Sequence, residues 1–384
     1  MSELSYLEKL LDGVEVEWRN LGDTSLFEIA NNGRKPVKAS LRIAGETPYY
    51  GANNIQDYVD GYTHDGEYVL IAEDGSASLE NYSIQYATGK FWANNHVHVV
   101  RGKERVHSRF LYHYLCIVNF LPFLTGGGRA KLTKGQLIEI PVPIPCPDNP
   151  EKSLAIQSEI VRILDKFTAL TAELTAELTA ELNMRKKQYN YYRDQLLSFK
   201  EGEVEWKTLG EVAQFKRGTA ITQKQTTPGE IPVVANGPIP TYFHSESNRQ
   251  GETIVIARSG AYAGYVSFWD QPIFLTDAFS VHSDLKIVKP KFIYHVLQNK
   301  QEHIHAMKKG AGVPHVRVKE FETYDIPIPP ITEQDRIVSI LDKFDTLTNS
   351  ITEGLPREIE LRQKQYEYYR DLLFSFPKPE TVSK

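Results

Sequence analysis

The sequence predicts a mixed α/β protein in which two similar globular domains are separated by long helices that pair as an antiparallel coiled coil. Three observations predict this architecture. Residues 160–199 and 337–376 are identical at roughly 23 of 40 positions without a gap. The segment VEWRNLGD at 16–23 returns as VEWKTLGE at 204–211. Finally, 384 residues are more than one hydrophobic core usually needs. Together these observations indicate two copies of one structural unit.

The repeat is circular, because the start of the chain resembles the end of the long repeated segment. Tyr6 and Leu10 precede the first VEW sequence, and Tyr192 and Leu196 hold the matching places before the second. A circular repeat gives the molecule approximate two-fold symmetry. The expected segments are an N-terminal segment that completes the repeat (1–14), a first globular domain (15–150), a first helical spacer (151–200), a second globular domain (201–330), a second helical spacer (331–376) and a tail (377–384).

Each helical spacer follows a proline-rich stretch, at 141–145 and 326–330, which must be extended. Apolar residues then recur every three or four positions, and no proline or glycine interrupts 151–199. In the second spacer, Gly354 and Pro356 predict either a kink or two helices with Pro356 in the first turn of the second. A long helix with one apolar face needs a partner, and the other spacer is the expected one.

Three copies of the sequence TAEL fill residues 171–182 of the first spacer. Each unit adds about 6 Å and slightly more than one turn to a helix. The run therefore predicts a ruler that sets the separation of the two globular domains. The alternative is replication slippage in a helix that tolerates extra turns.

Composition narrows the class of protein. Charged residues make up 24 % of the chain, and the formal net charge is −5, which taken alone argues against a nucleic-acid binder. No apolar run approaches ~18 residues, and the first residues lack the pattern of a signal peptide, so neither a membrane span nor secretion is expected. Two cysteines, Cys116 and Cys146, are too few for a disulfide scaffold. This cysteine content fits a reducing, cytoplasmic setting.

No sequence pattern predicts catalysis. The chain has no Walker A loop and no Asn/Asp-Pro-Pro-Tyr/Phe sequence of the amino-methyltransferase kind. His96 and His98 alternate on a predicted strand, where ordinary polar strand residues are the alternative to a metal pair. We therefore expect a binding protein without a metal or cofactor of its own.

Two divergent domains alternate with two near-identical helices that carry ILDKF…YYRDQLLSF and ILDKFDTLT…YYRDLLFSF, and TAEL units lie in the first. This arrangement resembles the specificity (HsdS) subunit of type I restriction–modification enzymes. The TAEL units resemble those of the IC subfamily. The resemblance implies two target-recognition domains that each bind half of a bipartite, asymmetric site in double-stranded DNA. It also implies that the helices dock two modification (methyltransferase) subunits, which restriction (motor/nuclease) subunits join. S-adenosylmethionine, ATP and Mg²⁺ would then belong to these partners.

Contacts with DNA need cations for the phosphates and amides or guanidinium groups for the base edges. Neither domain is basic overall, with 13 Lys and Arg against 15 Asp and Glu over 15–150, and 14 against 14 over 201–330. Local clusters therefore matter. One glycine-rich loop occurs at the same repeat position in both domains, with a solvated loop as the alternative to DNA contact. Its candidate residues are Arg129, Lys131 and Lys134 in the first domain and Lys308, Lys309, His315, Arg317 and Lys319 in the second.

Further candidates follow buried strands or begin the domains. Arg258 ends a strong apolar strand, and Glu73 holds the matching place in the first domain. An arginine in one domain and a glutamate at the matching place in the other would suit half-sites with different bases. The alternative is that both residues belong to the loop surface and contact no base. The remaining candidates are Asn53 and Asn236, which also fit turns, and the phosphate anchors Arg34, Lys35, Lys216 and Arg217. A two-headed scaffold that links partner proteins without reading DNA is the alternative function.

Overall fold

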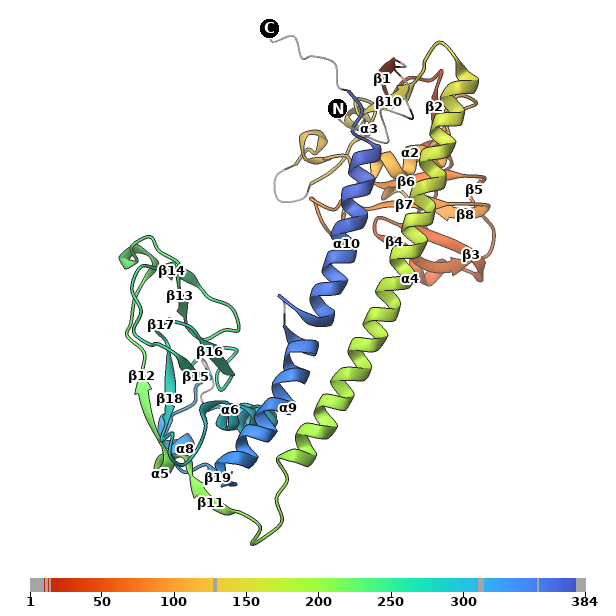
Figure 1. Ribbon diagram of the computed structural model, residues 1–384. Coiled ribbons are helices and arrows are strands. Elements are labelled where there is room, and N and C mark those ends of the chain that lie inside the picture. Colours follow the sequence, from red (N-terminus) through yellow and green to blue (C-terminus); the bar gives the residue numbers. More distant parts are fainter. Residues whose placement is uncertain are drawn as a thin grey trace. The chain divides into compact units, whose positions relative to one another are not determined.

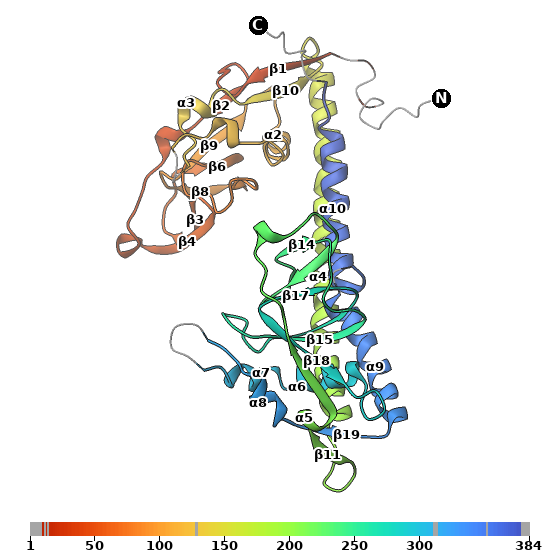
Figure 2. The ribbon, with the colours of Figure 1, turned by 90° about the vertical axis from the view of Figure 1, so that its left-hand side faces the viewer.

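The computed structural model describes residues 10, 13, 15–126, 130–309, 314–350 and 352–377. The chain forms two compact units, shown with their elements labelled in Figures 1 and 2. Unit 1 comprises residues 1–175 and 361–384, and unit 2 comprises residues 176–360. Each unit therefore contains one globular domain, which we call domain 1 and domain 2, together with parts of both helical spacers.

Domain 1 is built on two four-stranded sheets. The first is antiparallel, with strand order β2 (Phe27–Ile29), β9 (Val97–Gly102), β6 (Tyr68–Ala72), β7 (Ile84–Ala87). The second is mixed, with strand order β4 (Asn54–Val59), β3 (Ala44–Gly51), β8 (Lys90–Ala93), β5 (His64–Asp65). Helix α2 (Ser108–Leu115) packs across β6, β7 and β9. All five residues of β6 are buried, as its uninterrupted apolar sequence requires.

Domain 2 repeats this plan, with one strand fewer in its second sheet. The first sheet has the order β12 (Ala213–Arg217), β18 (Ala278–Ser283), β15 (Glu252–Ala257), β16 (Val266–Asp270). The second sheet has the order β14 (Tyr242–His244), β13 (Ile231–Val234), β17 (Phe274–Leu275). Helix α6 (Pro290–Asn299) takes the place of α2, and it contacts β15 and β16. The shared strand order confirms that the chain holds two copies of one mixed α/β plan.

A two-stranded ribbon joins the start of each domain to its end. In domain 1, β1 (Val16–Asn20) pairs antiparallel with β10 (Pro141–Pro145). In domain 2, β11 (Glu205–Thr208) pairs with β19 (Asp325–Ile328). Proline has no N–H group to donate to a neighbouring strand, so these segments suit a ribbon with one partner. The extended conformation of the proline-rich stretches is thus confirmed. By pairing with the VEW segments, these stretches join the end of each domain to its start.

The first spacer is one helix and the second is two. Helix α4 runs from Pro150 to Leu196, 47 residues, and the side chain of Asn149 accepts a hydrogen bond from the amide of Lys152 (3.0 Å) at its start. Helix α9 (Ile331–Asn349) is followed by α10 (Gly354–Leu373). Pro356 lies in the first turn of α10, where its missing N–H costs no hydrogen bond. Of the two alternatives for this segment, the structure therefore shows the helix break.

The helices of the two spacers contact each other within each unit. In unit 1, Phe167 of α4 stacks on Tyr369 of α10 with ring centroids 5.3 Å apart. One residue later on α4, the Thr168 hydroxyl lies 3.1 Å from the hydroxyl of Tyr366, three residues earlier on α10, as antiparallel helices require. In unit 2, Phe344 of α9 packs against two tyrosines of α4.

Each domain is fastened to the N-terminal part of its own spacer by the same polar contacts. In domain 1, Nε2 of His113 on α2 lies 2.7 Å from Oδ1 of Asp165 on α4. The side chain of Gln157 accepts a hydrogen bond from the amide of His107 (2.9 Å), the residue that precedes α2. In domain 2, Gln334 accepts in the same way from the amide of Lys289, which precedes α6 (2.8 Å). These contacts fix each domain on its helix through groups that the repeat preserves.

No helix in the described ranges is apolar enough over a sufficient length to cross a bilayer.

Candidate nucleic-acid interface

Five of the predicted site residues line one cavity in domain 2. The cavity has a volume of about 600 Å³. The residues that line it are Arg217, Arg258, Ser259, Phe279, His315, Val316, Arg317, Val318, Lys319 and Glu322. They come from sequence positions more than 100 apart, so the fold brings together cations that the sequence shows only as separate candidates.

Backbone pairing between two loops holds this cavity in place. The loop after β15 meets the segment before α8 (Val318–Glu322), where the amide of Val316 donates to the carbonyl of Arg258 (2.9 Å). Ser259 forms an isolated bridge with His315, which also bridges to Lys309. Because backbone bonds fix both loops, the guanidinium group of Arg258 and the side chains around His315 are held close to one another.

The cations of the cavity differ in how they are paired. Nε of Arg258 lies 3.0 Å from Oδ1 of Asp277. Arg217, Arg317 and Lys319 are exposed, and none of the three has an ion pair among the residues that the structure describes. Outside the cavity lining, Nζ of Lys309 lies 2.7 Å from Oε1 of Glu320. Three exposed cations without a carboxylate partner make this cavity attractive to an anion.

Strand register identifies the corresponding place in domain 1. The amide of Leu132 donates to the carbonyl of Glu73 (2.7 Å), as that of Val316 does to Arg258. Lys131 bridges to both Asp74 and Thr125, as His315 does to Ser259 and Lys309. Glu73 and Lys131 of domain 1 therefore correspond to Arg258 and His315 of domain 2.

Domain 1 carries an ion-pair network at this place. Nη1 of Arg34 lies 2.6 Å from Oε2 of Glu73, and Nζ of Lys131 lies 3.1 Å from Oε1 of the same carboxylate. The side chains of Arg34 and Glu73 are only 18 % and 16 % exposed. Burial by itself would raise the pKa of Glu73, but the hydrogen bonds from Arg34 and Lys131 outweigh it and lower the pKa. Glu73 is thus an ionised internal partner rather than simple loop surface.

A buried histidine lies beside this network. His98 is fully buried, and its Nε2 donates to the carbonyl of Leu132 (2.7 Å) while its Nδ1 lies 2.9 Å from Nδ2 of Asn31. Burial lowers the pKa of His98, so the neutral ring is favoured. Among the residues that the structure describes, no group of three His, Cys, Asp or Glu side chains is placed to hold a metal ion. His98 and the neighbouring His96, which pairs with Asp74 (2.5 Å), therefore have structural partners.

The other predicted site residues that the structure describes lie outside the cavity and the network. Arg129 lies outside the described residues, and Lys134 is exposed at the start of α3 (Lys134–Leu137). Asn53 donates to the carbonyl of Gly75 (2.7 Å) and accepts from the amide of Ala77 (2.8 Å), so its amide holds a loop. The remaining four are Lys35, above the ring of Trp92 (5.8 Å), Lys216, which is exposed, Asn236, which is half-buried, and Lys308, whose Nζ donates to the carbonyl of Ala261 (2.9 Å).

Sequence inspection did not single out the acidic partners that decide which cations are paired. Asp277 and Glu320 pair with Arg258 and Lys309 across 19 and 11 sequence positions. Glu320 lies three residues after Arg317 and accepts its amide hydrogen bond (3.0 Å), which is a helix-start pattern visible in the sequence. Asp277 follows no such pattern, because its contact depends on the pairing of β15 with β18.

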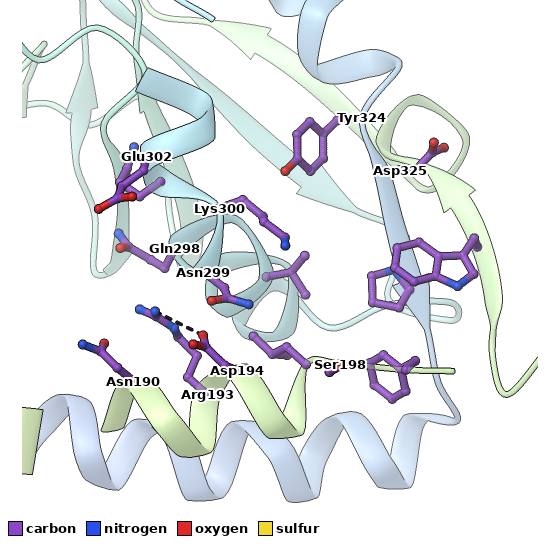
Figure 3. Close-up of a pocket in the computed structure, with 16 residues that line it drawn as sticks. Asn190, Arg193, Asp194, Ser198, Gln298, Asn299, Lys300, Glu302, Tyr324 and Asp325 are labelled. Carbon is purple, nitrogen blue, oxygen red and sulfur yellow. Dashed lines mark hydrogen bonds and ion pairs between the residues drawn. The ribbon is translucent and has the colours of Figure 1, made fainter. Parts of the chain in front are cut away.

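A second cavity in unit 2, of about 790 Å³, has a mainly polar rim and is drawn in Figure 3. It lies beside Trp206, whose side chain is half exposed. The repeat explains its origin, because Leu197 and Val296 line it where unit 1 has the larger Phe374 and Tyr114. In unit 1 those two rings pack 5.7 Å apart, and the indole of Trp18 donates to the carbonyl of Pro377 (2.8 Å). The smaller side chains of the second copy leave this volume open.

Comparison with known proteins places the whole chain in one family. Residues 14–184 and 201–361 each match the type I restriction modification DNA specificity domain. A putative type I restriction enzyme specificity subunit of Haemophilus influenzae is 50 % identical over 97 % of this chain and 98 % of its own length. The specificity subunit of a type I restriction enzyme of Escherichia coli is 43 % identical over the full length of both chains.

Solved structures agree with the fold. The crystal structure of the S subunit of a type I restriction–modification system from M. genitalium matches 96 % of this chain and 98 % of its own, with a TM-score of 0.58 at 18 % identity. The two domain matches and the relatives of full length lead to one conclusion: this chain belongs to the family of type I restriction enzyme specificity subunits.

Proposed function

We propose that this chain is the DNA-reading, non-catalytic subunit of a type I restriction–modification complex, and that each domain reads one half of a bipartite, asymmetric site. The observation that carries the proposal is the cavity of domain 2, where four cationic side chains and one histidine from separate parts of the chain meet. Membership of the family supports it, as does the presence of the same two-loop arrangement in domain 1.

The chemistry of these sites suits the edges of base pairs and the phosphates of a duplex. Arginine donates two hydrogen bonds to guanine, and lysine and arginine neutralise phosphates. Loops that begin at buried strands present such groups on a rigid support. The net charge of −5 implies that this chain alone binds DNA weakly. Much of the phosphate neutralisation must then come from partner subunits.

The repeated spacer suits two copies of one partner. Tyr191 of α4 and Tyr368 of α10 hold equivalent places in the repeat, and their side chains are 61 % and 64 % exposed. Exposed tyrosines are typical anchors of protein interfaces. Two modification subunits would therefore find equivalent surfaces, with restriction subunits joining them. S-adenosylmethionine, ATP and Mg²⁺ would be bound by those partners, in the cytoplasm.

The spacer helices would also set the distance between the two half-sites. The TAEL units of 171–182 lie inside the uninterrupted helix α4, so each unit adds about 6 Å to it. The scaffold alternative explains the acidic charge, but it leaves the cationic cavity without a role.

The proposal is tested by measuring DNA binding by this chain in complex with its modification subunit. A complex that prefers one bipartite duplex over a scrambled duplex supports the proposal. Substitution of Arg317 and Lys319 by Gln should weaken that binding, whereas the same change at Lys286, an exposed lysine of domain 2 outside the cavity lining, serves as a charge control. Equal binding of matched and scrambled duplexes would support the scaffold alternative.

A further inference from the structure

Equivalent positions in the two domains carry different charges. Strands β12 and β2 pair with β18 and β9 in the same register, so Arg217 corresponds to Asn31. The loops and short helices that follow align in the same way. The four cations of the domain 2 cavity, Arg217, Arg258, Arg317 and Lys319, therefore correspond to Asn31, Glu73, Thr133 and Gly135 in domain 1.

Two of the cations that the structure describes near this place in domain 1 are already neutralised by one carboxylate. Arg34 pairs with Glu73 and also donates to the carbonyl of Val97 (2.9 Å), inside the domain. Lys131 pairs with the second oxygen of the same carboxylate (3.1 Å). A cation that is paired with a carboxylate must give up that partner before it can neutralise a DNA phosphate and release a counterion. Lys134 is the exposed cation of this segment that has no ion pair within the described ranges.

Most of the cations that line the domain 2 cavity are not paired with a carboxylate of the described residues. Of the four that line the cavity, Arg258 is paired with Asp277, whereas Arg217, Arg317 and Lys319 are exposed without an ion pair in the described part of the chain. Glu322 is the one carboxylate in the lining. Each cation that neutralises a phosphate releases a counterion and steepens the salt dependence of binding by about 0.9 in log–log slope.

We infer that the two recognition domains contact DNA unequally: of the salt-sensitive affinity that the described residues of this chain add, domain 2 supplies most through Arg217, Arg317 and Lys319, whereas in domain 1 Glu73 holds Arg34 and Lys131. This inference rests on the proposed function. It implies that Glu73 restrains DNA binding by domain 1 and does not contact a base. It also implies that the contribution of domain 2 to affinity is the one that falls most steeply as salt rises.

The first test compares salt slopes of the complex with the modification subunit on a duplex that carries its methylated motif. Arg217→Gln, Arg317→Gln and Lys319→Gln together should lower the slope by about 2.7, three times the value for one contact. The affinity that wild type loses between 50 and 200 mM salt should then exceed the loss of this variant by about 40-fold. Lys131→Gln with Lys134→Gln in domain 1 should lower the slope by about 0.9 at most, through Lys134 alone.

The second test is a gain of binding. Glu73→Gln frees Lys131, so the slope should rise by about 0.9 and affinity at low salt should increase. Arg34 also donates to the carbonyl of Val97, an acceptor that this substitution does not remove. Glu333→Gln removes the same charge from an arginine ion pair of equal length on α9 and should leave the slope unchanged. Urea unfolding confirms that each variant is folded.

The outcomes separate the inference from the function on which it rests. Equal slope losses for the domain 1 and domain 2 variants, or an unchanged slope for Glu73→Gln, would overturn the inference while leaving DNA reading intact. A wild-type complex that binds motif and scrambled duplexes equally would overturn the proposed function itself.

Discussion

Nε2 of His295 on α6 lies 2.8 Å from Oδ1 of Asp342 on α9, and His113 and Asp165 repeat this contact in unit 1 at 2.7 Å. His295 is fully buried, and Nζ of Lys291 reaches the other oxygen of Asp342 (2.8 Å). Burial would raise the pKa of Asp342, but the bonds from His295 and Lys291 outweigh it and lower the pKa. The contact fastens a variable domain to a helix that the repeat preserves.

Asp342→Asn should therefore destabilise unit 2 by about 2 kcal/mol, because the buried imidazole loses its charged acceptor. Urea unfolding at neutral pH measures this. Asp335→Asn on the same helix breaks the exposed pair with Lys289 (3.2 Å) and should cost less than about 1 kcal/mol. Equal costs for the two variants would contradict the proposed fastening.

Asp342 also predicts a dependence on acid. Its pKa in the folded protein lies below the ordinary aspartate value of 3.8, so its stabilisation is present above that value and is lost as pH falls through the lowered pKa. Wild type should lose stability below about pH 4 more steeply than Asp342→Asn does. Parallel curves for the two proteins would show that the carboxylate is not responsible.

The buried His98 predicts a separate dependence at milder pH. Its Nδ1 accepts from Nδ2 of Asn31, and Oδ1 of Asn31 is held by the amide of Val99 (2.9 Å), so a protonated ring would meet a donor. Because burial lowers the pKa of His98 below 6.5, the unfolded chain binds more protons just below that pH. The free energy of unfolding of wild type should fall as pH drops from 7.5 to 5.5.

The control for His98 comes from the repeat, since Phe279 holds its place in domain 2. His98→Phe costs stability at all pH values because it leaves Asn31 without this partner. It should nevertheless show a smaller loss between pH 7.5 and pH 5.5 than wild type. An equal loss would assign the effect to other groups, of which His113, whose pKa burial also lowers, is the first to examine.

The break between α9 and α10 predicts a sensitive glycine. Gly354 has a φ of +74°, and a Cβ there would lie 2.5 Å from the carbonyl oxygen of Thr346. Gly354→Ala should cost about 3 kcal/mol, from the left-handed backbone and the clash together. Gly89→Ala, at a φ of +67° with nothing within 4 Å, should cost only about 1 kcal/mol. Urea unfolding measures both costs. Equal losses of unfolding free energy for the two variants would show that the clash at Gly354 contributes nothing.

The TAEL units predict a change in the target rather than in stability. Deletion of 171–174 should shorten the spacer between the half-sites and leave both half-site sequences unchanged, because it removes one unit of α4 without touching either domain. Thr→Ser changes inside the units, which keep the length, should leave the spacer as it is. Methylation mapping that finds the original spacer after the deletion would support simple slippage as the origin of the repeat.

Periodicity and repetition made the larger features predictable. The three- and four-residue spacing of apolar residues gave the long helix, and the gapless match between the spacers indicated that both copies share one plan. Gly354 and Pro356 marked the helix break, because their backbone limits are local. Such features depend on neighbours in the sequence, which is why they could be found without a structure.

The state of each candidate cation could not be predicted in this way. Arg34 and Glu73 are 39 positions apart, and their contact depends on how β6 and β9 pair. The repeat correctly gave Glu73 and Arg258 equivalent positions in the two domains. It could not show that Arg34 and Lys131 both pair with Glu73. Equal candidates in the sequence thus became an ion-pair network in one domain and a cavity of exposed cations in the other.

Single-molecule methylation mapping of DNA from cells that carry this chain with its modification subunit shows whether the chain directs methylation to a bipartite site. We expect one asymmetric motif in two parts with a fixed spacer. We also expect substitutions in the domain 2 cavity to weaken methylation without altering the half-site read by domain 1. A continuous motif, or no methylation dependent on this chain, would contradict the proposed function.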